Sequence, residues 1–434
     1  MTRPPARTDH DSAEPSPDDL AGTGYRGDEL VVGAGHLPLV LGLLDGLGVA
    51  TAPPDVDDVL DLARVRLRRP TAEAADAVLT RCADRHAGDP DAWRDGCPGA
   101  DRPLDRLLWG LRHLTGHDHG GWTPTLGKNR LMGRVHGVGE IIHGSAGDPS
   151  AVGDWTAPTR RPGGPGQGVR VGVLDTGLYP QPFLAGGWRA RFSDLLGAEG
   201  AGYADGHATF VTGLVLAQAP AATVEVRGAL RGPDGSADTW TVATEAVRFA
   251  RSGIDVLNLS LACYTEDGQP PLLIARAIER LSAQLVVVAA AGNHGALPGD
   301  VAGVPVRSLP AFPAALDGVL AVGAGDAEGR RAPFSPDQPW VDVLAPGVDV
   351  RSTYLRVVAG GSAPAFDGWA RWSGTSFAAA LVTGAIAAGT DPGRVSAREA
   401  LADFRAALAR LGGTPTVAAD GRVPAPPFVP LAAW

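Results

Sequence analysis

From residue 169 onward the sequence alternates short, almost purely apolar runs with stretches of helical spacing. The apolar runs are 169–174, 211–217, 254–261, 285–291 and 319–323. Stretches such as 239–252 and 271–282 have apolar residues at helical spacing. Strands buried on both faces of a sheet are continuously apolar, and helical connections make neighbouring strands parallel. This alternation predicts an α/β fold with a doubly wound, mostly parallel sheet.

The bulk composition supports a globular chain. Of the 434 residues, 44% are hydrophobic and 20% are charged, which favours a folded chain with a sizeable core. The formal net charge of -10 and the lack of a basic run argue against nucleic-acid binding. The three cysteines, Cys82, Cys97 and Cys263, imply no disulfide framework.

The sequence contains no apolar run long enough to span a bilayer. Residues 1–27 also lack the apolar segment typical of a secretion signal. We therefore expect a cytoplasmic protein with no membrane partner.

Changes in composition divide the chain into five segments. Residues 1–27 are rich in Pro, Asp and Ser and predict a disordered tail. Residues 28–145 predict a small N-terminal α+β extension. Its expected elements are a strand at 29–32 and helices at 37–47, 71–85 and 103–115, whereas 55–68 fits either type. The other segments are a Gly/Pro-rich linker at 146–168, the α/β domain at 169–412 with a last helix at 396–411, and a C-terminal extension at 413–434.

Two weaker patterns in the N-terminal extension predict no cofactor or metal. Gly33-Ala34-Gly35 follows a strand as in a dinucleotide-binding turn, but Pro38 replaces the third glycine. His113, His117 and His119 form a histidine cluster. A polar loop explains this cluster better than a metal site, since no fourth ligand is evident.

Polar residues stand where predicted strands end or helices begin. Asp175 directly follows the first apolar run, Ser260 lies at the end of the third, Asn293 comes after the fourth, and His207 opens an apolar stretch. Ser376 follows a small-residue turn and precedes an alanine-rich run, which places its hydroxyl at a helix N-terminus. Taken singly, each of these residues is also explained as a helix cap, as a turn residue, or as a buried polar residue whose hydrogen bonds are all made.

Together these residue types favour nucleophilic catalysis. A serine hydroxyl is a weak nucleophile that needs a base, and the base needs a group to orient it. Ser376, His207 and Asp175 supply the hydroxyl, the imidazole and the carboxylate. The amide of Asn293 can donate a hydrogen bond to a developing oxyanion.

The surrounding motifs resemble those of the subtilisin-like serine peptidase family (subtilases, peptidase S8). The matching stretches are 171–177 around the aspartate, 206–213 around the histidine, 256–261, 312–315, 319–324, 334–335, 341–347, and 374–379 around the serine. The resemblance covers about residues 168–392. The chain order Asp, His, Ser is the order already known for subtilisin.

The resemblance implies a subtilisin-like fold and a serine endopeptidase acting on peptide or protein substrates. Ser376 would attack the scissile carbonyl, His207 would shuttle the proton, and Asp175 would hold the imidazole tautomer. Asn293 and the Ser376 amide would form the oxyanion hole. The substrate-binding strand would comprise Ser260, Leu261 and Ala262. Calcium is common in the family, but no ligand set for it is evident, so we predict no certain cofactor.

The sequence departs from the family pattern at five positions, one of which is Ala208, where a glycine is usual. Phe210 replaces a second, non-catalytic histidine, and Ala380 replaces a proline after the serine motif. We expect both changes to leave the chemistry intact. Ala262 and Cys263 stand where glycines are usual, so we expect a narrower cleft. Cys263 is either redox-sensitive or, as we favour, an inert thiol.

Several alternatives remain. An α/β-hydrolase would need a G-x-S-x-G motif and its histidine last, which this chain lacks. A subtilisin-like peptide-binding protein with impaired catalysis is the main alternative to an active peptidase. The extension at 28–145 is either an inhibitory pro-segment or a recognition module, and we expect it to pack on the peptidase domain.

Overall fold

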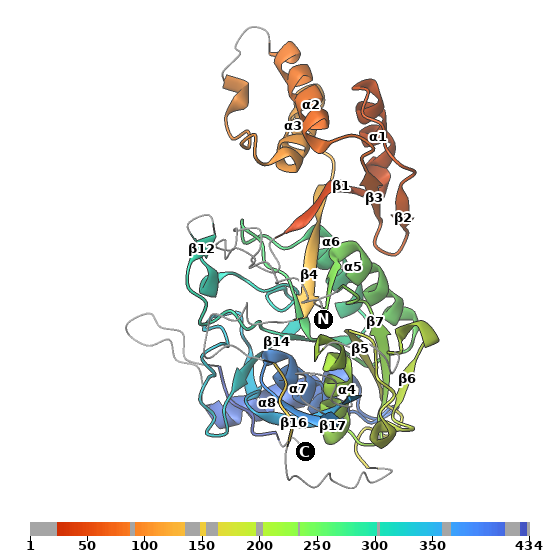
Figure 1. Cartoon of the computed structure of the whole chain (residues 1–434), viewed down its shortest axis with the longest axis vertical. Coiled ribbons are helices and arrows are strands. Elements are labelled where there is room, and N and C mark those ends of the chain that lie inside the picture. Colours follow the sequence, from red (N-terminus) through yellow and green to blue (C-terminus); the bar gives the residue numbers. More distant parts are fainter. Residues whose placement is uncertain are drawn as a thin grey trace, which may run out of the picture.

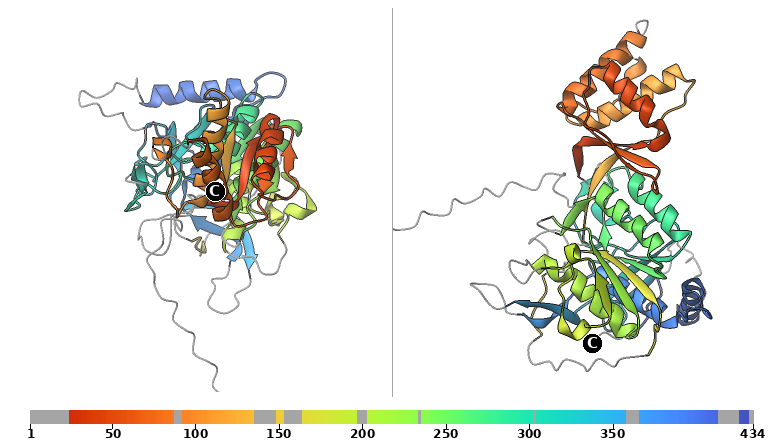
Figure 2. Two further views of the ribbon diagram at one scale, coloured as in Figure 1. Left: turned by 90° about the horizontal axis from the view of Figure 1, so that it is seen from above. Right: turned by 90° about the vertical axis from the view of Figure 1, so that its right-hand side faces the viewer.

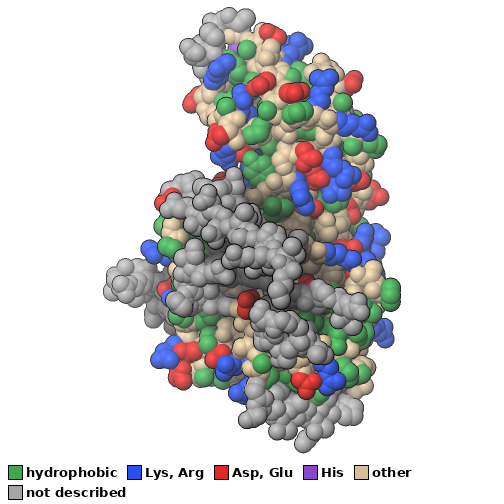
Figure 3. Space-filling view, in the orientation of Figure 1, with side chains coloured by type: hydrophobic (Ala, Val, Ile, Leu, Met, Phe, Trp, Pro, Cys, Tyr) green, Lys and Arg blue, Asp and Glu red, His purple; other side chains and the backbone are tan. Residues whose placement is uncertain are grey.

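The computed structural model describes residues 24–86, 92–134, 148–152, 164–196, 203–232, 235–301, 304–357, 366–412 and 426–431. A larger α/β part and a smaller N-terminal region lie one above the other along the long axis of the molecule (Figures 1 and 2). Charged side chains of both signs are interspersed over the visible face of the N-terminal region (Figure 3). Within the described part of the chain, no helix is both long enough and apolar enough to cross a membrane.

The core of the larger part is a sheet of seven parallel strands in the order β15-β14-β11-β9-β5-β7-β6. The strands are β5 (Arg170–Asp175), β6 (Trp188–Ala190), β7 (Thr223–Gly228), β9 (Val256–Leu259), β11 (Val286–Ala290), β14 (Val319–Gly325) and β15 (Val343–Pro346). Every residue of β9, β11 and β14 is buried, as their continuous apolar sequence requires. The predicted α/β fold is confirmed.

Helices cover both faces of this sheet. One face is covered by α4 (His207–Gln218), α7 (Thr375–Gly389) and α8 (Ala397–Gly412), and the other by α5 (Thr239–Val247) and α6 (Leu272–Ser282). In β9, Val256 belongs to the apolar cluster that contains α7 and α8, and Leu257 to the cluster that contains α5 and α6. The predicted last helix, 396–411, is α8, and it packs against the α7 side.

One predicted strand is a helix, and three strands of the parallel sheet escaped prediction. Residues 211–217 lie inside α4, where almost every position is buried, so no polar stripe distinguishes this helix from a strand. The strands β6, β7 and β15 were missed. In β7 only alternate residues are buried, because this strand lies next to the edge strand β6.

The N-terminal region is an antiparallel sheet in the order β10-β4-β1-β3-β2, with β8 also paired to β4. Its strands are β1 (Tyr25–Gly33), β2 (Asp55–Asp57), β3 (Leu62–Arg66), β4 (Leu126–Arg134), β8 (Ser236–Asp238) and β10 (Leu261–Ala262). The helices α1 (Leu37–Gly46), α2 (Thr71–Arg85) and α3 (Pro103–Asp118) cover one face, on which Leu30 and Val32 are buried. Val31 faces the opposite way and packs with Trp240 of α5 and Leu273 of α6. The N-terminal region therefore packs on the α/β part, as expected.

Short elements complete the described chain. The remaining strands are β12 (Asp300–Val301), β13 (Val304–Pro305), β16 (Val350–Val357) and β17 (Phe366–Trp372). The 3-10 turns are η2 (Ala34–His36), η3 (Ala92–Arg94), η4 (Pro182–Leu184), η5 (Phe192–Asp194), η6 (Tyr203–Gly206), η7 (Arg248–Arg251) and η8 (Val306–Ser308).

The structure corrects two expectations for the N-terminal region and decides one that the sequence left open. Residues 25–27, assigned to the disordered tail, are the start of β1. Residues 55–68 contain two strands, β2 and β3, and no helix. His113 and His117 lie on α3 and not in a loop. Most of the predicted linker at 146–168 and of the extension at 413–434 lies outside the described residues, so those boundaries stay predictions.

Candidate active site

Asp175 and His207 meet at the carboxyl end of the sheet. Asp175 is the last residue of β5 and is fully buried, and His207 is the first residue of α4. The Nδ1 atom of His207 lies 2.7 Å from Oδ1 and 2.9 Å from Oδ2 of Asp175. The backbone amide of Thr176 donates to Oδ1 at 2.7 Å, which fixes the carboxylate. This arrangement leaves Nε2 of His207 as the nitrogen available for proton transfer.

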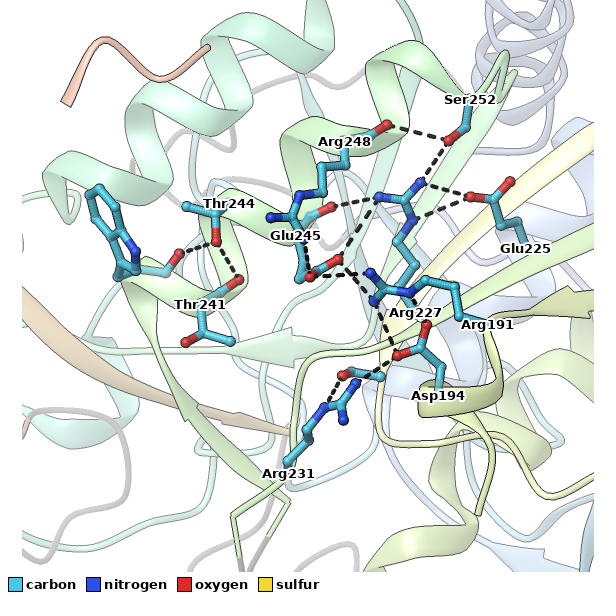
Figure 4. A network of polar contacts seen from close by, with 12 residues as sticks. Arg191, Asp194, Glu225, Arg227, Arg231, Thr241, Thr244, Glu245, Arg248 and Ser252 are labelled. Carbon is cyan, nitrogen blue, oxygen red and sulfur yellow. Dashed lines mark hydrogen bonds and ion pairs between the residues drawn. The ribbon is translucent and has the colours of Figure 1, made fainter. Parts of the chain in front are cut away.

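A network of arginines and carboxylates includes Asp194 (Figure 4), which contacts the loop after Asp175. The carbonyl oxygen of Asp194 accepts the amide of Leu178 at 2.8 Å. The side chain of Asp194 is buried and accepts Nη2 of Arg191 at 3.1 Å and Nη2 of Arg231 at 2.7 Å. Such charge-assisted bonds to a buried carboxylate are strong, so this network fixes the strand end that carries Asp175.

Ser376 is the second residue of α7 and faces the end of β9. Its hydroxyl donates to the carbonyl oxygen of Ser260 at 3.4 Å, and the Ser260 hydroxyl donates to the Ser376 carbonyl at 3.0 Å. Among the described residues no hydrogen bond joins the Ser376 hydroxyl to His207. Catalytic hydrogen bonds are often long without substrate and tighten when it binds. The backbone amide of Ser376 lies in the first turn of α7, where amides have no intrahelical acceptor.

Asn293 is oriented by the residue before the serine. Its Oδ1 accepts both the amide and the hydroxyl of Thr375, each at 3.0 Å. Two donors on one oxygen assign the amide orientation, so Nδ2 is directed away from Thr375. A Cβ built on Gly374 would lie 3.4 Å from this Nδ2, which places the donor beside the turn that delivers Ser376. The arrangement suits donation to a developing oxyanion.

Comparison with known proteins identifies the family. The family model described as "Subtilase family" matches residues 166–392, which is more than half of the chain. The chain belongs to the subtilase family. This is a family of serine proteases, and the predicted resemblance is confirmed.

Several bacterial proteases are similar to this subtilase. Subtilisin Savinase from Lederbergia lenta is 33% identical over 232 residues, which are 51% of this chain and 76% of that protein. An alkaline protease from Shouchella clausii is also 33% identical over 232 residues, covering 51% and 54%. A thermophilic serine proteinase from Bacillus sp. (strain AK1) is 32% identical over 269 residues, covering 59% and 60%. The chain thus spans between half and about three quarters of the length of these relatives.

One solved structure shares the fold over most of this subtilase. Fervidolysin from Fervidobacterium pennivorans, a keratinolytic enzyme related to subtilisin, superposes with a TM-score of 0.57 at 17% identity. The match covers 94% of this chain and 60% of that chain. At this identity the likeness shows the fold alone.

Aromatic side chains pack around His207 in this subtilase. Its ring lies 5.6 Å from Trp372 and 5.5 Å from Phe377, between centroids. Phe210 is fully buried and its ring lies 4.5 Å from Phe377, so it joins this aromatic packing. Ala380 is buried within α7, which continues without interruption to Gly389. Neither departure from the family pattern disturbs the elements that carry the site.

The two residues at the glycine positions have different surroundings. Ala262 belongs to β10. Cys263 is fully buried in the apolar cluster that contains α5 and α6, and it exchanges two backbone hydrogen bonds with Phe312. Burial raises the pKa of the Cys263 thiol to about 12, so the thiol is protonated and inert, as favoured.

An N-terminal strand already occupies the edge of β10. In the antiparallel pairing of β4 with β10, Gly133 lies opposite Ala262 and Arg134 opposite Leu261. On its other side β4 pairs with β8, so its last residues lie between the two short strands. Two of the three residues predicted to bind substrate, Leu261 and Ala262, are therefore paired with the chain itself.

Sequence reasoning missed the residues that support this site. Asn258 donates to the Ser260 hydroxyl at 2.8 Å and accepts the Thr383 hydroxyl at 3.0 Å, and Thr375 accepts the Gly292 amide at 3.1 Å. For Asn258 and Thr383 the available signal was a polar residue inside an otherwise apolar run. In the N-terminal region, His86 joins the histidine cluster, 2.9 Å from His113 between Nε2 atoms. Among the described residues, no group of three or more His, Cys, Asp or Glu is arranged to hold a metal ion.

Proposed function

We propose that this subtilase is a serine endopeptidase that works through Asp175, His207 and Ser376. The observation that carries the proposal is the pairing of His207 Nδ1 with both carboxylate oxygens of Asp175, at 2.7 and 2.9 Å. The membership of residues 166–392 in a serine protease family adds support. The cytoplasmic location expected from the sequence stays part of this proposal.

In the proposed mechanism the Ser376 hydroxyl attacks the scissile carbonyl and passes its proton to Nε2 of His207. Asp175 keeps the other ring proton on Nδ1 and stabilises the imidazolium that forms. The imidazolium then protonates the leaving amine, which departs and leaves an acyl-enzyme. Water, activated by the same histidine, hydrolyses the ester and restores the serine.

The negative charge of the tetrahedral intermediate is stabilised by two proposed donors. They are Nδ2 of Asn293 and the backbone amide of Ser376. Because Thr375 binds Oδ1 of Asn293, the side-chain amide needs no reorientation during the reaction. Preorganised donors of this kind in a site shielded from water supply much of the rate enhancement of acyl transfer.

Labelling with a fluorophosphonate probe tests the proposal, because the probe reacts only with an activated serine. We expect the full chain to be labelled at a single site and the Ser376→Ala variant to remain unlabelled. Tandem mass spectrometry of the labelled peptide identifies the modified residue. If neither the full chain nor the Met132→Asp variant described below is labelled, the chain is instead a peptide-binding relative with impaired catalysis.

We also propose that the N-terminal region restricts access to the cleft. A substrate that adds an extended strand to β10 would need the edge that β4 occupies. The side chain of Met132 in β4 is 1% exposed and lies in an apolar cluster with Leu230 and Leu261. This contact favours the inhibitory interpretation of the N-terminal region over the recognition module.

Replacing Met132 with aspartate is expected to speed fluorophosphonate labelling about ten-fold or more. A carboxylate buried without a partner destabilises the packed state by several kcal/mol. We therefore expect β4 to separate from β10 in this variant. The labelling rate of the full-length variant is the measurement. Val56→Asp is the matched control, because Val56 lies in the same region but is 50% exposed, and it should label like the wild type. Unchanged labelling of a folded Met132→Asp variant would exclude the inhibitory role.

A further inference from the structure

Asn293 is held through its main chain as well as its side chain. Its backbone amide donates a hydrogen bond to the hydroxyl of Tyr264. Tyr264 follows β10 and Asn293 follows β11, and both of these chain segments border Ser376. The tyrosine therefore connects the proposed oxyanion donor to the strand that is predicted to bind substrate.

His294, the next residue, anchors the other side of the same loop. The side chain is 1% exposed, and its Nε2 lies 2.9 Å from the carbonyl oxygen of Leu309. This contact assigns the ring proton to Nε2, so Nδ1 is an acceptor. Nδ1 is buried and has no partner among the described residues. The rings of His294 and Tyr264 lie edge to face, 4.6 Å apart.

The side chains of Tyr264 and His294 lie close to Gly292. A Cβ at this glycine would lie 2.7 Å from Nδ1 of His294 and 2.9 Å from the Tyr264 hydroxyl oxygen. Its φ of +99° is also one that other residues rarely adopt. The Tyr264 hydroxyl accepts the Asn293 amide and still has a proton to donate, and Nδ1 of His294 is an unsatisfied acceptor beside it. The segment 292–294 is therefore held by Tyr264, which follows β10, and by the contact of His294 with Leu309.

We propose that Tyr264 and His294 are positioning residues that hold the main chain at 292–294 so that Nδ2 of Asn293 stays directed at the oxyanion. The proposal rests on the proposed function, since it concerns the same oxyanion hole. A displacement of about 1 Å at a reacting centre can cost about 10²-fold in rate. Thr375 fixes the side-chain oxygen of Asn293, whereas the tyrosine and the histidine fix the backbone from which that side chain extends.

The ionisation of both groups is compatible with this role. Burial lowers the pKa of His294 to about 4, so the ring is neutral at neutral pH and Nδ1 can accept a hydrogen bond. Burial raises the pKa of Tyr264, so its hydroxyl keeps the proton that it can donate.

A double-mutant cycle on the full chain tests whether Tyr264 acts through Asn293. The variants are Tyr264→Phe, Asn293→Ala and the double variant, compared by their rate of labelling with a fluorophosphonate. We expect a loss of about ten-fold for Tyr264→Phe, in the limiting rate and not in the half-saturating concentration. Asn293→Ala should lose about 10²-fold or more, a size known from subtilisin, a member of the same family. The double variant should be no slower than Asn293→Ala by more than about two-fold.

The outcomes separate this proposal from the proposed function. If the wild type labels and the losses of the two variants multiply, Tyr264 acts independently of Asn293 and the positioning role is wrong. Full activity of Tyr264→Phe would also overturn it. If neither the wild type nor the Met132→Asp variant labels, the proposed function itself fails.

Two further variants control for general damage. Tyr179→Phe removes a hydroxyl elsewhere in the α/β part and should label at the wild-type rate. His294→Gln can still donate to Leu309 and accept a hydrogen bond, so it should retain more activity than His294→Phe. Equal losses for these two histidine variants, at equal thermal stability, would contradict the proposed role of His294.

Discussion

Replacement of His207 with alanine is expected to reduce the hydrolysis of a chromogenic peptide by a factor of about 10⁴ or more. The size is taken over from subtilisin, in which loss of the histidine or the serine costs about 10⁶-fold in kcat. The physical reason is that the Ser376 hydroxyl then has no base, and water does not replace one in this buried site. His207 is 2% exposed and enclosed by Trp372 and Phe377.

The loss must be separated from a loss of fold, because His207 begins a buried helix. Thermal unfolding followed by circular dichroism measures that contribution, and a folded His207→Ala variant should still melt cooperatively. His119→Ala is the matched control, since His119 is exposed at the end of α3, and its activity should equal that of the wild type. A folded His207→Ala variant that keeps more than about a hundredth of the activity would show that another group is the base.

Replacement of Asp175 with asparagine is expected to cost about 10⁴-fold in kcat, as for the corresponding change in another serine protease fold. The shape of the side chain is retained, so the fold should be retained as well. Both carboxylate oxygens now approach Nδ1 of His207, whereas an asparagine can present an amide there. An amide donor favours the tautomer with the proton on Nε2, which cannot accept the proton of Ser376.

Steady-state kinetics distinguishes this effect from a weaker binding of substrate. The expected result is a fall in kcat with little change in KM, because Asp175 is fully buried and does not contact the substrate. Asp403→Asn, an exposed carboxylate on α8, makes the same chemical change without consequence. A fall confined to KM would mean that Asp175 shapes the cleft and does not orient the base.

The parallel sheet could be predicted because its central strands are fully buried. The strands β9, β11 and β14 have no polar face, so their sequence is continuously apolar. The same reasoning wrongly predicted a strand within α4. Because this helix is buried on all sides, its sequence has no polar stripe at helical spacing. The strand next to the edge, β7, carries little signal, since it buries only alternate residues and exposes Glu225 and Arg227 partly to solvent.

The candidate site was predictable to the extent that its residues end strands or begin helices. Asp175, His207, Asn293 and Ser376 all do so, and the structure brings them to one end of the sheet. The supporting contacts were not predictable, because they join residues distant in sequence, as in the bond between the Ser376 carbonyl and Ser260. Neither helical nor strand periodicity in the sequence indicates such a pair. The pairing of β4 with β10 was missed for the same reason.

Because β4 belongs to the same chain as β10, a peptide substrate must compete with a tethered strand for the edge of β10. A strand tethered to the same chain occupies its site at an effective concentration of about a millimolar, whatever the protein concentration. β4 is such a strand, since it pairs with β1 of the N-terminal region and, at its last residues, lies between β8 and β10 of the α/β part. A peptide present at about a micromolar would compete with β4 at a disadvantage of about 10³. Peptides would therefore reach the edge of β10 only if they bind it strongly or are locally abundant.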